Sequence, residues 1–262
     1  MESIHHYVQG DTFTCVARCE ETQMLGVAQA TSSIAVASRC PMAKARVGAL
    51  AVQACPDPRL RLLGIDLLEM GYSASKVVKE LRESDPYAEY RQFGVVDKDG
   101  NSAAFTGKDN LHWAGHIANK NYVAMGNFLK SEKTVAAMAE SFEASRGEAL
   151  EERLMRAIEA GEAAGGQRTR TFSAVIIVYD WDIFSRVDLR VDHHPEPIHE
   201  LRRILEVYKP LIDYYALRPV RGTNLSPYEW LESHGATEED LKRYYLDGLD
   251  EMQEFVKEQA GT

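Results

Sequence analysis

Hydrophobic and polar residues alternate along the first part of the chain, and this period of two predicts β-strands. Residues 12–53 contain an alternating segment, a tight turn, a second apolar segment, a polar break and a third strand. Phe13, Cys15 and Ala17 occupy every second position of the first segment, so they would share one buried face. We therefore expect residues 12–53 to form the core of a sheet.

Later segments predict further strands and helices in groups. An Asp-Gly pair at 99–100 separates two apolar stretches and predicts a hairpin. The continuous apolar run at 172–180 indicates a central strand, whereas helical spacing is clear at 58–70 and again from residue 197. Because strands and helices are segregated rather than strictly alternating, the pattern predicts an α+β protein with two packed sheets and helices outside.

The chain changes character after residue 209. A capping-box pattern with proline at the first helical position occurs at 226–229, and a charge-rich helical segment follows from residue 237. Gly248 inside that segment costs about 1 kcal/mol relative to alanine, which allows a break there. We expect one main domain over residues 1–209 and a helical C-terminal extension over residues 210–262.

Composition narrows the class of function. The net charge of −10 and the pI of about 5.3 argue against a nucleic-acid partner and against an anionic membrane surface. No apolar run approaches the ~20 residues of a membrane span, and the N-terminal segment lacks the pattern of a secretory signal. The four cysteines form no CxxC pair, which favours free thiols over a zinc site. We expect a cytoplasmic protein that needs no metal and no cofactor.

Several motifs together resemble one bacterial family. They are TFTCVAR, LGVAQATSS, VGALAVQA, YRQFGVVDKDGNSAAFTG, WAGH, GNFL and VDLRVDHHPEP, in this order between about residues 12 and 208. This set resembles the domain of unknown function 1028 family, which is regarded as Ntn-hydrolase-like. The resemblance implies a four-layer αββα sandwich and hydrolysis of an amide or a related C–N bond.

Ntn hydrolases use a Thr, Ser or Cys at the start of the mature chain, and its α-amino group can act as the general base. The family pattern begins at Thr12, so the resemblance points to this residue as the nucleophile. Lys44 follows 32 positions later and could lower the pKa of the hydroxyl if folding brought the two together. Residues 1–11 precede Thr12 in the sequence. Either they are removed, or another group acts as the base, or the chain is not an Ntn-type enzyme.

Other polar residues are candidates for binding or stabilising a substrate. Ser38 and Arg39 come just before the polar break, where Arg39 could bind a carboxylate, and Arg91 could do the same. Gly126 and Asn127 end a predicted strand and could form an oxyanion hole. For each of them a structural role, as a surface ion pair or a turn, is the alternative.

Trp113 and His116 could provide a pocket wall and a proton carrier, and His194 could act as a base oriented by Asp192. His193 and His194 also invite a metal-site interpretation, but neighbours on a strand point to opposite faces, which argues against it. A buried structural pair and a helix-entry turn are the alternatives for these two groups.

Three hypotheses follow. The first is an amidohydrolase acting on a small polar metabolite through Thr12, Lys44 and Asn127. The second is a deaminase of an enamine, imine or aminated ring-cleavage product, with His194 or His116 as acid and base and no covalent step. The third is a non-catalytic binding or assembly protein. We also expect a homo-oligomer, because the appended tail and acidic surface are compatible with subunit contacts.

Overall fold

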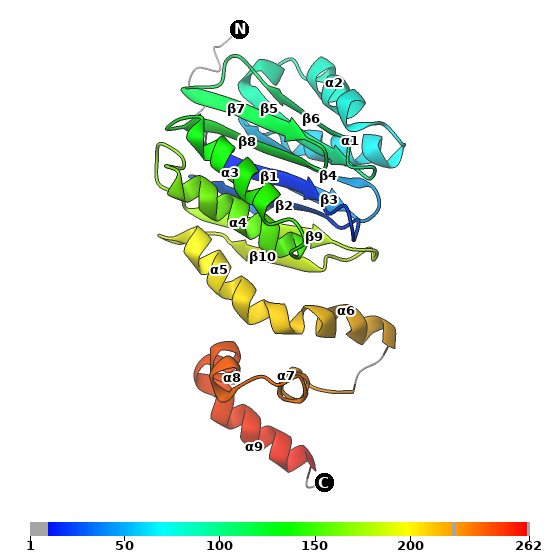
Figure 1. Ribbon diagram of the computed structural model, residues 1–262, viewed down its shortest axis with the longest axis vertical. Coiled ribbons are helices and arrows are strands. Elements are labelled where there is room, and N and C mark those ends of the chain that lie inside the picture. The colour runs from blue at the N-terminus through cyan, green and yellow to red at the C-terminus, as the bar shows by residue number, and fades with distance from the viewer. Residues whose placement is uncertain (1–9, 222–223, 261–262) are drawn as a thin grey trace. The chain divides into compact units, whose positions relative to one another are not determined.

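The computed structural model describes residues 10–221 and 224–260. Within residues 10–221 the strands form two antiparallel sheets, one of six strands in the order β10-β9-β2-β1-β8-β7 and one of four in the order β3-β4-β5-β6 (Figure 1). The strands are β1 (Thr12–Arg18), β2 (Leu25–Thr31), β3 (Pro41–Lys44), β4 (Gly48–Ala54), β5 (Arg91–Asp97), β6 (Ser102–Thr106), β7 (Trp113–Asn119), β8 (Tyr122–Leu129), β9 (Ser173–Tyr179) and β10 (Val187–Val191).

The two sheets pack face to face between two pairs of helices. Helices α1 (Pro58–Glu69) and α2 (Ala74–Ser84) contact the four-stranded sheet. Helices α3 (Lys133–Ala144) and α4 (Leu150–Ala163) cover strands β1, β2, β8 and β9 of the six-stranded sheet (Figure 1). Strand β1 contacts β4 and β5 of the other sheet. The predicted α+β class and the four-layer αββα sandwich are therefore confirmed.

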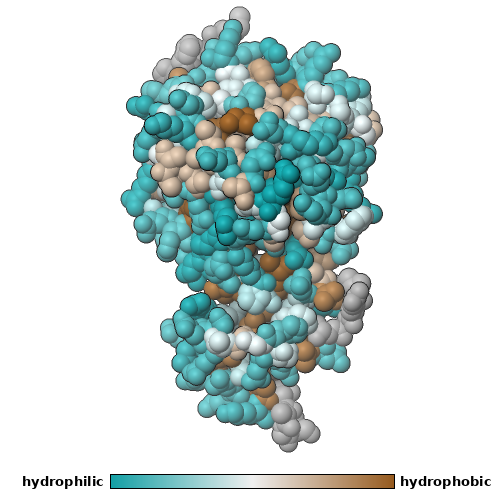
Figure 2. Space-filling view, in the orientation of Figure 1, coloured by the Kyte–Doolittle hydropathy of each residue, from teal (hydrophilic) through white to brown (hydrophobic). Residues whose placement is uncertain are grey.

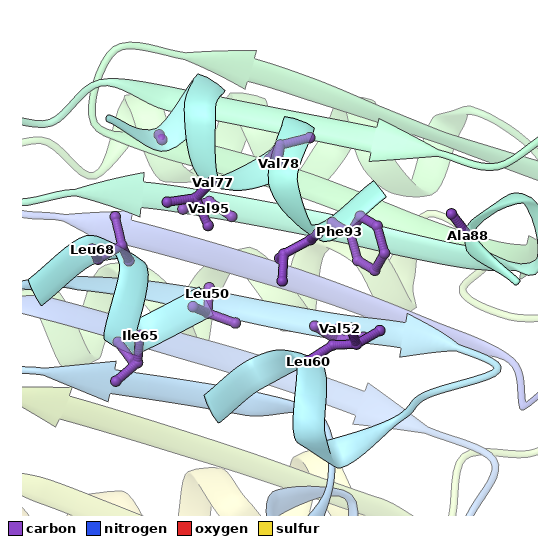
Figure 3. Packing of buried hydrophobic residues seen from close by; sticks show 12 residues of the cluster. Leu50, Val52, Leu60, Ile65, Leu68, Val77, Val78, Ala88, Phe93 and Val95 are labelled. Atoms are coloured by element: carbon purple, nitrogen blue, oxygen red, sulfur yellow. The ribbon is translucent and has the colours of Figure 1, made fainter. Parts of the chain in front are cut away.

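Apolar residues on the outer face of the four-stranded sheet explain the positions of α1 and α2. Alternate residues of β4 and β5, Leu50, Val52, Phe93 and Val95, point at the helices (Figure 3). The helices present apolar residues at helical spacing toward them: Leu60, Ile65, Leu68, Val77, Val78 and Leu81. Each fully buried side chain of this kind contributes roughly 1.5–3 kcal/mol through loss of water contact.

The layer between the sheets is apolar over most of its length. Val16, Val27, Ala49, Val96 and Met125 lie in one buried cluster. Because β1 and β4 are buried on both faces, their residues are almost all inaccessible to solvent. The polar side chains of these strands are therefore forced to find partners inside the protein.

Residues 39–53 form a hairpin rather than the single strand expected from sequence. Strand β3 ends at Lys44, and Gly48 opens β4 directly opposite it. The turn between them contains Arg46 with a positive φ of 60°. No Asn-Gly or Asp-Gly pair is present to signal this turn, which is why the pattern did not predict it.

The described chain divides into two compact units, the first ending at Leu201 and the second beginning at Arg202. The division falls inside α5 (Pro197–Tyr208), whereas we expected it after residue 209. The helices that follow are α6 (Ile212–Arg221), α7 (Pro227–Ser233), α8 (Glu238–Tyr245) and α9 (Leu249–Ala260). The second unit has a small core of its own: Leu211, Tyr214, Tyr228, Leu231, Leu241 and Leu249.

Two local predictions for this unit are confirmed. The capping box at α7 is formed, since Ser226 Oγ accepts from the Glu229 backbone N–H and the Glu229 carboxylate accepts from the Ser226 N–H. The helical segment after residue 237 breaks at Leu246–Gly248, which separates α8 from α9. Local capping and glycine signals are thus sufficient to place these helix ends.

The surface is mainly hydrophilic on the face shown in Figure 2, where apolar residues occur in small separate groups. Among the helices of residues 10–221 and 224–260, none has the length and apolar character needed to cross a bilayer.

Candidate active site

Thr12 is the first residue of β1 and lies between two polar residues of the neighbouring strands. It is paired with Thr31, the last residue of β2, and with Asn127, near the end of β8. All three are buried, and Thr12 is 4% exposed. The antiparallel register of three strands therefore brings together hydroxyl and amide groups that are far apart in sequence.

The hydroxyls of Thr12 and Thr31 form a directed chain that ends on the carbonyl oxygen of Asp11. Thr31 Oγ1 donates to the Asp11 carbonyl oxygen at 2.7 Å. Thr12 Oγ1 lies 2.9 Å from Thr31 Oγ1, whose own hydrogen is already used, so Thr31 can only accept from Thr12. The Gly10 carbonyl, at 3.3 Å, is a second acceptor for the Thr12 hydroxyl. The Ser32 backbone N–H also donates to the Asp11 carbonyl, at 3.0 Å. Two donors thus polarise the carbonyl that precedes Thr12.

Residues 10 and 11 take up the remaining polar groups around Thr12. The Thr169 N–H donates to Asp11 Oδ2 at 2.7 Å, and the Asp11 N–H donates to Ser32 Oγ at 3.0 Å. Asn127 Nδ2 donates to the Gly10 carbonyl at 2.7 Å. Burial raises the pKa of the Asp11 carboxyl, although the bond from Thr169 opposes the shift. Gly10 and Asp11 therefore occupy this set of donors.

A buried amide network lies between the sheets next to Thr12, with Gln53 of β4 at its centre. Gln53 Oε1 accepts from Thr14 Oγ1 at 2.5 Å and from Gln29 Nε2 at 3.0 Å. Gln53 Nε2 donates to Gln92 Oε1 at 2.7 Å and to Asn127 Oδ1 at 3.3 Å. All five residues are fully buried. The network fixes the orientation of the Asn127 amide, whose Nδ2 faces Gly10.

The network continues to the imidazole of His116 on β7. Gln92 Nε2 donates to Thr106 Oγ1 at 2.8 Å, and Thr106 Oγ1 lies 2.9 Å from His116 Nδ1. Partial desolvation lowers the pKa of His116. Hydrogen bonds therefore connect the His116 imidazole, whose neutral form is favoured, to the Asn127 amide beside Thr12.

Trp113 lies on the same strand as His116, and its ring covers Gly115. A Cβ at Gly115 would lie 2.8 Å from the indole, so only glycine leaves room for this ring position. Trp113 is half-buried at the edge of the six-stranded sheet. The indole therefore forms part of the surface near His116.

Lys44 is not brought to Thr12. It is the last residue of β3 and pairs with Gly48, at the end of β4 opposite Gln53. Gln53 is the β4 residue that contacts β1 near Thr12, since its side chain accepts from Thr14. Gly48 and Gln53 are five positions apart along β4, which corresponds to about 16 Å. The Lys44 ammonium instead donates to both carboxylate oxygens of Glu69 at 2.6 Å, and the Lys44 side chain is 44% exposed.

The arginine candidates have partners within the protein. Arg91 is buried and pairs with the Asp85 carboxylate and the Cys55 carbonyl. Arg39 Nη2 donates to the Ile34 carbonyl at 2.6 Å, and the neighbouring Ser38 hydroxyl donates to the Ala35 carbonyl at 2.8 Å. These contacts stabilise loops at the ends of strands.

Arg91 also borders a cavity of about 710 Å³ beside the start of α1. Cys55, Leu60, Tyr87 and Tyr90 are among the other lining residues. Neither Thr12 nor Asn127 lines this cavity. The Arg91 pocket is therefore formed by a different set of residues from the Thr12 cluster.

Gly126 contributes its carbonyl oxygen, which accepts from Gln92 Nε2 at 3.0 Å, and its backbone belongs to the ladder with β1 and β7. A Cβ at this position would lie 2.5 Å from Leu129 Cδ1 and 3.1 Å from the Thr12 carbonyl oxygen. Gly126 thus allows β1 and β8 to approach each other at Thr12.

His194 lies in the loop between β10 and α5. Its imidazole Nδ1 accepts from the Glu196 backbone N–H at 3.1 Å, and the His194 backbone N–H donates to the Phe172 carbonyl. These bonds define a turn before the helix. In the described ranges no three side chains among His, Cys, Asp and Glu come together as a metal ion would require.

Of the amide network, the sequence pattern indicated only Asn127, and it did not indicate Thr31. A usable signal was present, because Gln29, Gln53 and Gln92 each lie beside apolar residues in a strand that is buried along its whole length. A polar residue inside a strand buried on both faces must be hydrogen-bonded, which marks these positions as interior polar contacts. Their common location could not be read without the strand order.

Comparison with known proteins identifies relatives of the first unit. The model of a family of unknown function, DUF1028, matches residues 12–201. The crystal structure of protein SPO2555 from Silicibacter pomeroyi, a DUF1028 protein, is 31% identical with a TM-score of 0.71 over 76% of this chain and 89% of that chain. Anbu (ancestral beta-subunit) from Yersinia bercovieri is 13% identical with a TM-score of 0.38, over 81% of this chain and 100% of that chain. No curated protein matches.

Proposed function

The chain belongs to the DUF1028 family, and we propose that it is a cofactor-free hydrolase of a C–N bond in a small polar metabolite, with Thr12 as its nucleophile. One observation carries the proposal. The carbonyl before Thr12 accepts hydrogen bonds from Thr31 Oγ1 and the Ser32 N–H, and Thr12 Oγ1 lies beside that pair. Two donors on one carbonyl oxygen are what stabilises the oxyanion of acyl transfer.

In this proposal the Asp11–Thr12 peptide bond is the first one cleaved. Thr12 Oγ1 attacks the Asp11 carbonyl carbon, its proton passes toward Thr31 Oγ1, and the oxyanion is held by Thr31 and Ser32. The C–N bond then breaks, and the nitrogen takes the proton that Thr12 Oγ1 released, passed on by Thr31 Oγ1, to become the α-amino group of Thr12. Water hydrolyses the resulting ester and restores the Thr12 hydroxyl.

The cleaved chain would contain the complete catalytic group. A free α-amino group has an unperturbed pKa of about 7.7–8.0, so it can accept the hydroxyl proton near neutral pH. This removes the need for Lys44, which is bound to Glu69. Thr31 Oγ1 and the Ser32 N–H, released from Asp11, would donate to the substrate carbonyl, and Asn127 Nδ2, released from Gly10, would bind a neighbouring carbonyl.

The test is the intact mass and N-terminal sequence of the protein during incubation after purification. We expect a product that begins at Thr12, and hydrolysis of amide substrates only by that product. Thr12→Ala should stay uncleaved and inactive with an unchanged fold, and Thr12→Ser should still cleave. Thr22→Ala, in the exposed turn before β2, is the matched control. Amide hydrolysis by uncleaved Thr12→Ala would refute the proposal.

A second candidate, deamination without a covalent step, is favoured by the hydrogen-bond path from His116 to Asn127. A neutral His116 could move a proton on a substrate held near Trp113. This reaction needs no release of Thr12. Turnover of an enamine by Thr12→Ala, lost in His116→Gln, would select it.

A further inference from the structure

We infer that the released Thr12 site selects acyl groups that carry a carboxylate, with an aspartyl group as the best fit. The inference rests on the proposed function, because the site becomes vacant only when residues 10 and 11 leave. It names the class of substrate that the same residues would then bind.

Self-cleavage and substrate turnover would form an ester on the same oxygen. During the proposed self-cleavage, the ester on Thr12 Oγ1 is an aspartyl ester formed by Asp11. A substrate of the released enzyme forms its ester on the same oxygen and needs the same oxyanion donors. The groups that surround Asp11 are therefore the groups that would surround the acyl part of the substrate.

These groups contact the backbone N–H, the carbonyl oxygen and one carboxylate oxygen of Asp11. The Thr169 N–H binds the side-chain carboxylate, and Thr31 Oγ1 and the Ser32 N–H bind the carbonyl oxygen. Ser32 Oγ accepts from the backbone N–H. Asn127 Nδ2 binds the preceding carbonyl, so a further acyl group on the nitrogen is also accommodated. An apolar acyl group would lose the hydrogen bond that the Thr169 N–H makes to the carboxylate.

The loop that holds the carboxylate supports the same class. Thr169 is flanked by Arg168 and Arg170, which give this loop positive charge in a chain of net charge −10. Gln167, two residues earlier, is 4% exposed, and within the described residues its Nε2 and Oε1 have no hydrogen-bond partner. The loop thus has a hydrogen-bond donor and an acceptor, both on Gln167, that Asp11 does not use.

The experiment uses the released protein and three matched probes: the 7-amido-4-methylcoumarin derivatives of N-acetylaspartate, N-acetylasparagine and N-acetylalanine. We expect kcat/KM for the aspartyl probe to exceed that for the alanyl probe about 10- to 100-fold, the effect of losing one hydrogen bond to a charged group. Asparagine tests whether charge is needed, because it keeps the size and removes the carboxylate.

Calorimetry with N-acetylaspartate and N-acetylalanine separates binding from catalysis. Selective binding of N-acetylaspartate without hydrolysis of any probe would support the inferred ligand class and reject the proposed hydrolase. Hydrolysis of all three probes at similar rates, or equal binding of both acids, would overturn the inference while leaving the hydrolase in place. A chain that keeps Asp11 attached overturns both.

A substitution in the segment before Thr12 provides the control. Asp11→Ala changes the acyl group of the self-cleavage step but leaves the released chain identical. We expect slower release of Thr12, by about 10- to 100-fold, with the same kcat/KM once release is complete. Unchanged release in Asp11→Ala would show that the Thr169 contact does not recognise the carboxylate, and would contradict the inference.

Discussion

Thr12 Oγ1 lies 2.9 Å from Thr31 Oγ1, and the Thr31 hydroxyl is itself committed to the carbonyl of Asp11. Thr12 is the first residue of β1 and Thr31 is the last residue of β2, and the two are paired in the sheet register. The Thr12 hydroxyl has two acceptors, Thr31 Oγ1 and the Gly10 carbonyl at 3.3 Å, and neither is the carbonyl that its oxygen would attack. The contact between Thr12 and Thr31 is the relationship on which the proposed chemistry depends.

Thr31→Val tests that relationship directly. The substitution keeps the shape of the side chain but removes the hydroxyl that stabilises the Asp11 oxyanion. We expect release of Thr12 to slow about 100- to 1000-fold, the usual effect of losing one oxyanion donor. Intact mass measured against time checks this, and Thr31→Ser should restore the rate. Unaltered release in a folded Thr31→Val protein would exclude the hydroxyl from the reaction.

Gln53→Leu should destabilise the fold more than any single surface change. Gln53 makes hydrogen bonds to Thr14, Gln29, Gln92 and Asn127, and the substitution leaves these buried groups without a partner. Since each unpaired buried group costs about 1–3 kcal/mol, we expect a loss of at least about 3 kcal/mol in the free energy of unfolding. Urea denaturation measures it. Gln253→Leu, in α9 of the second unit, is a control of the same type and should change the value little.

Lys44→Ala should have little effect. The ion pair with Glu69 is formed by side chains that are 44% and 52% exposed, and such surface pairs contribute about 0–1 kcal/mol. We expect release of Thr12 and turnover to be unchanged, as measured by intact mass and probe hydrolysis. A large loss of activity in Lys44→Ala would mean that Lys44 reaches Thr12 in the working enzyme.

His116 should titrate below its ordinary pKa of 6.5, because partial desolvation disfavours its charged form. The unfolded chain then binds more protons than the folded one just below pH 6.5. The stability due to this group is therefore complete above pH 6.5 and is lost as pH falls through the lowered pKa. NMR of the imidazole resonances measures the midpoint, and a value at or above 6.5 would contradict the assignment.

The cysteines should differ in reactivity toward iodoacetamide. Burial raises the pKa of Cys15 and of Cys40 to about 12, whereas Cys55 is half-buried at the cavity edge with a smaller rise. Only the thiolate reacts, so Cys55 should be labelled first and its rate should increase with pH. Peptide mass spectrometry identifies the site. Cys55→Ser should then leave the folded protein almost unlabelled.

Local patterns determined the elements and their kind. The alternation around Phe13, the Asp-Gly hairpin, the capping box at Ser226 and the break at Gly248 depend on neighbours in sequence, so they could be predicted from sequence. The αββα arrangement followed from the grouping of strands and helices together with the family resemblance. These features are set by short-range sterics and by hydrophobic periodicity.

The composition of the site was decided by tertiary structure. Thr12 was selected from sequence, but its partner proved to be Thr31 rather than Lys44, because a hairpin turn at Arg46 directs Lys44 to the opposite end of the sandwich. Gln53 and Asn127 meet only because β1 is hydrogen-bonded to β8 and packed against β4. Strand order and register depend on contacts between distant segments, and spacing along the chain does not contain that information.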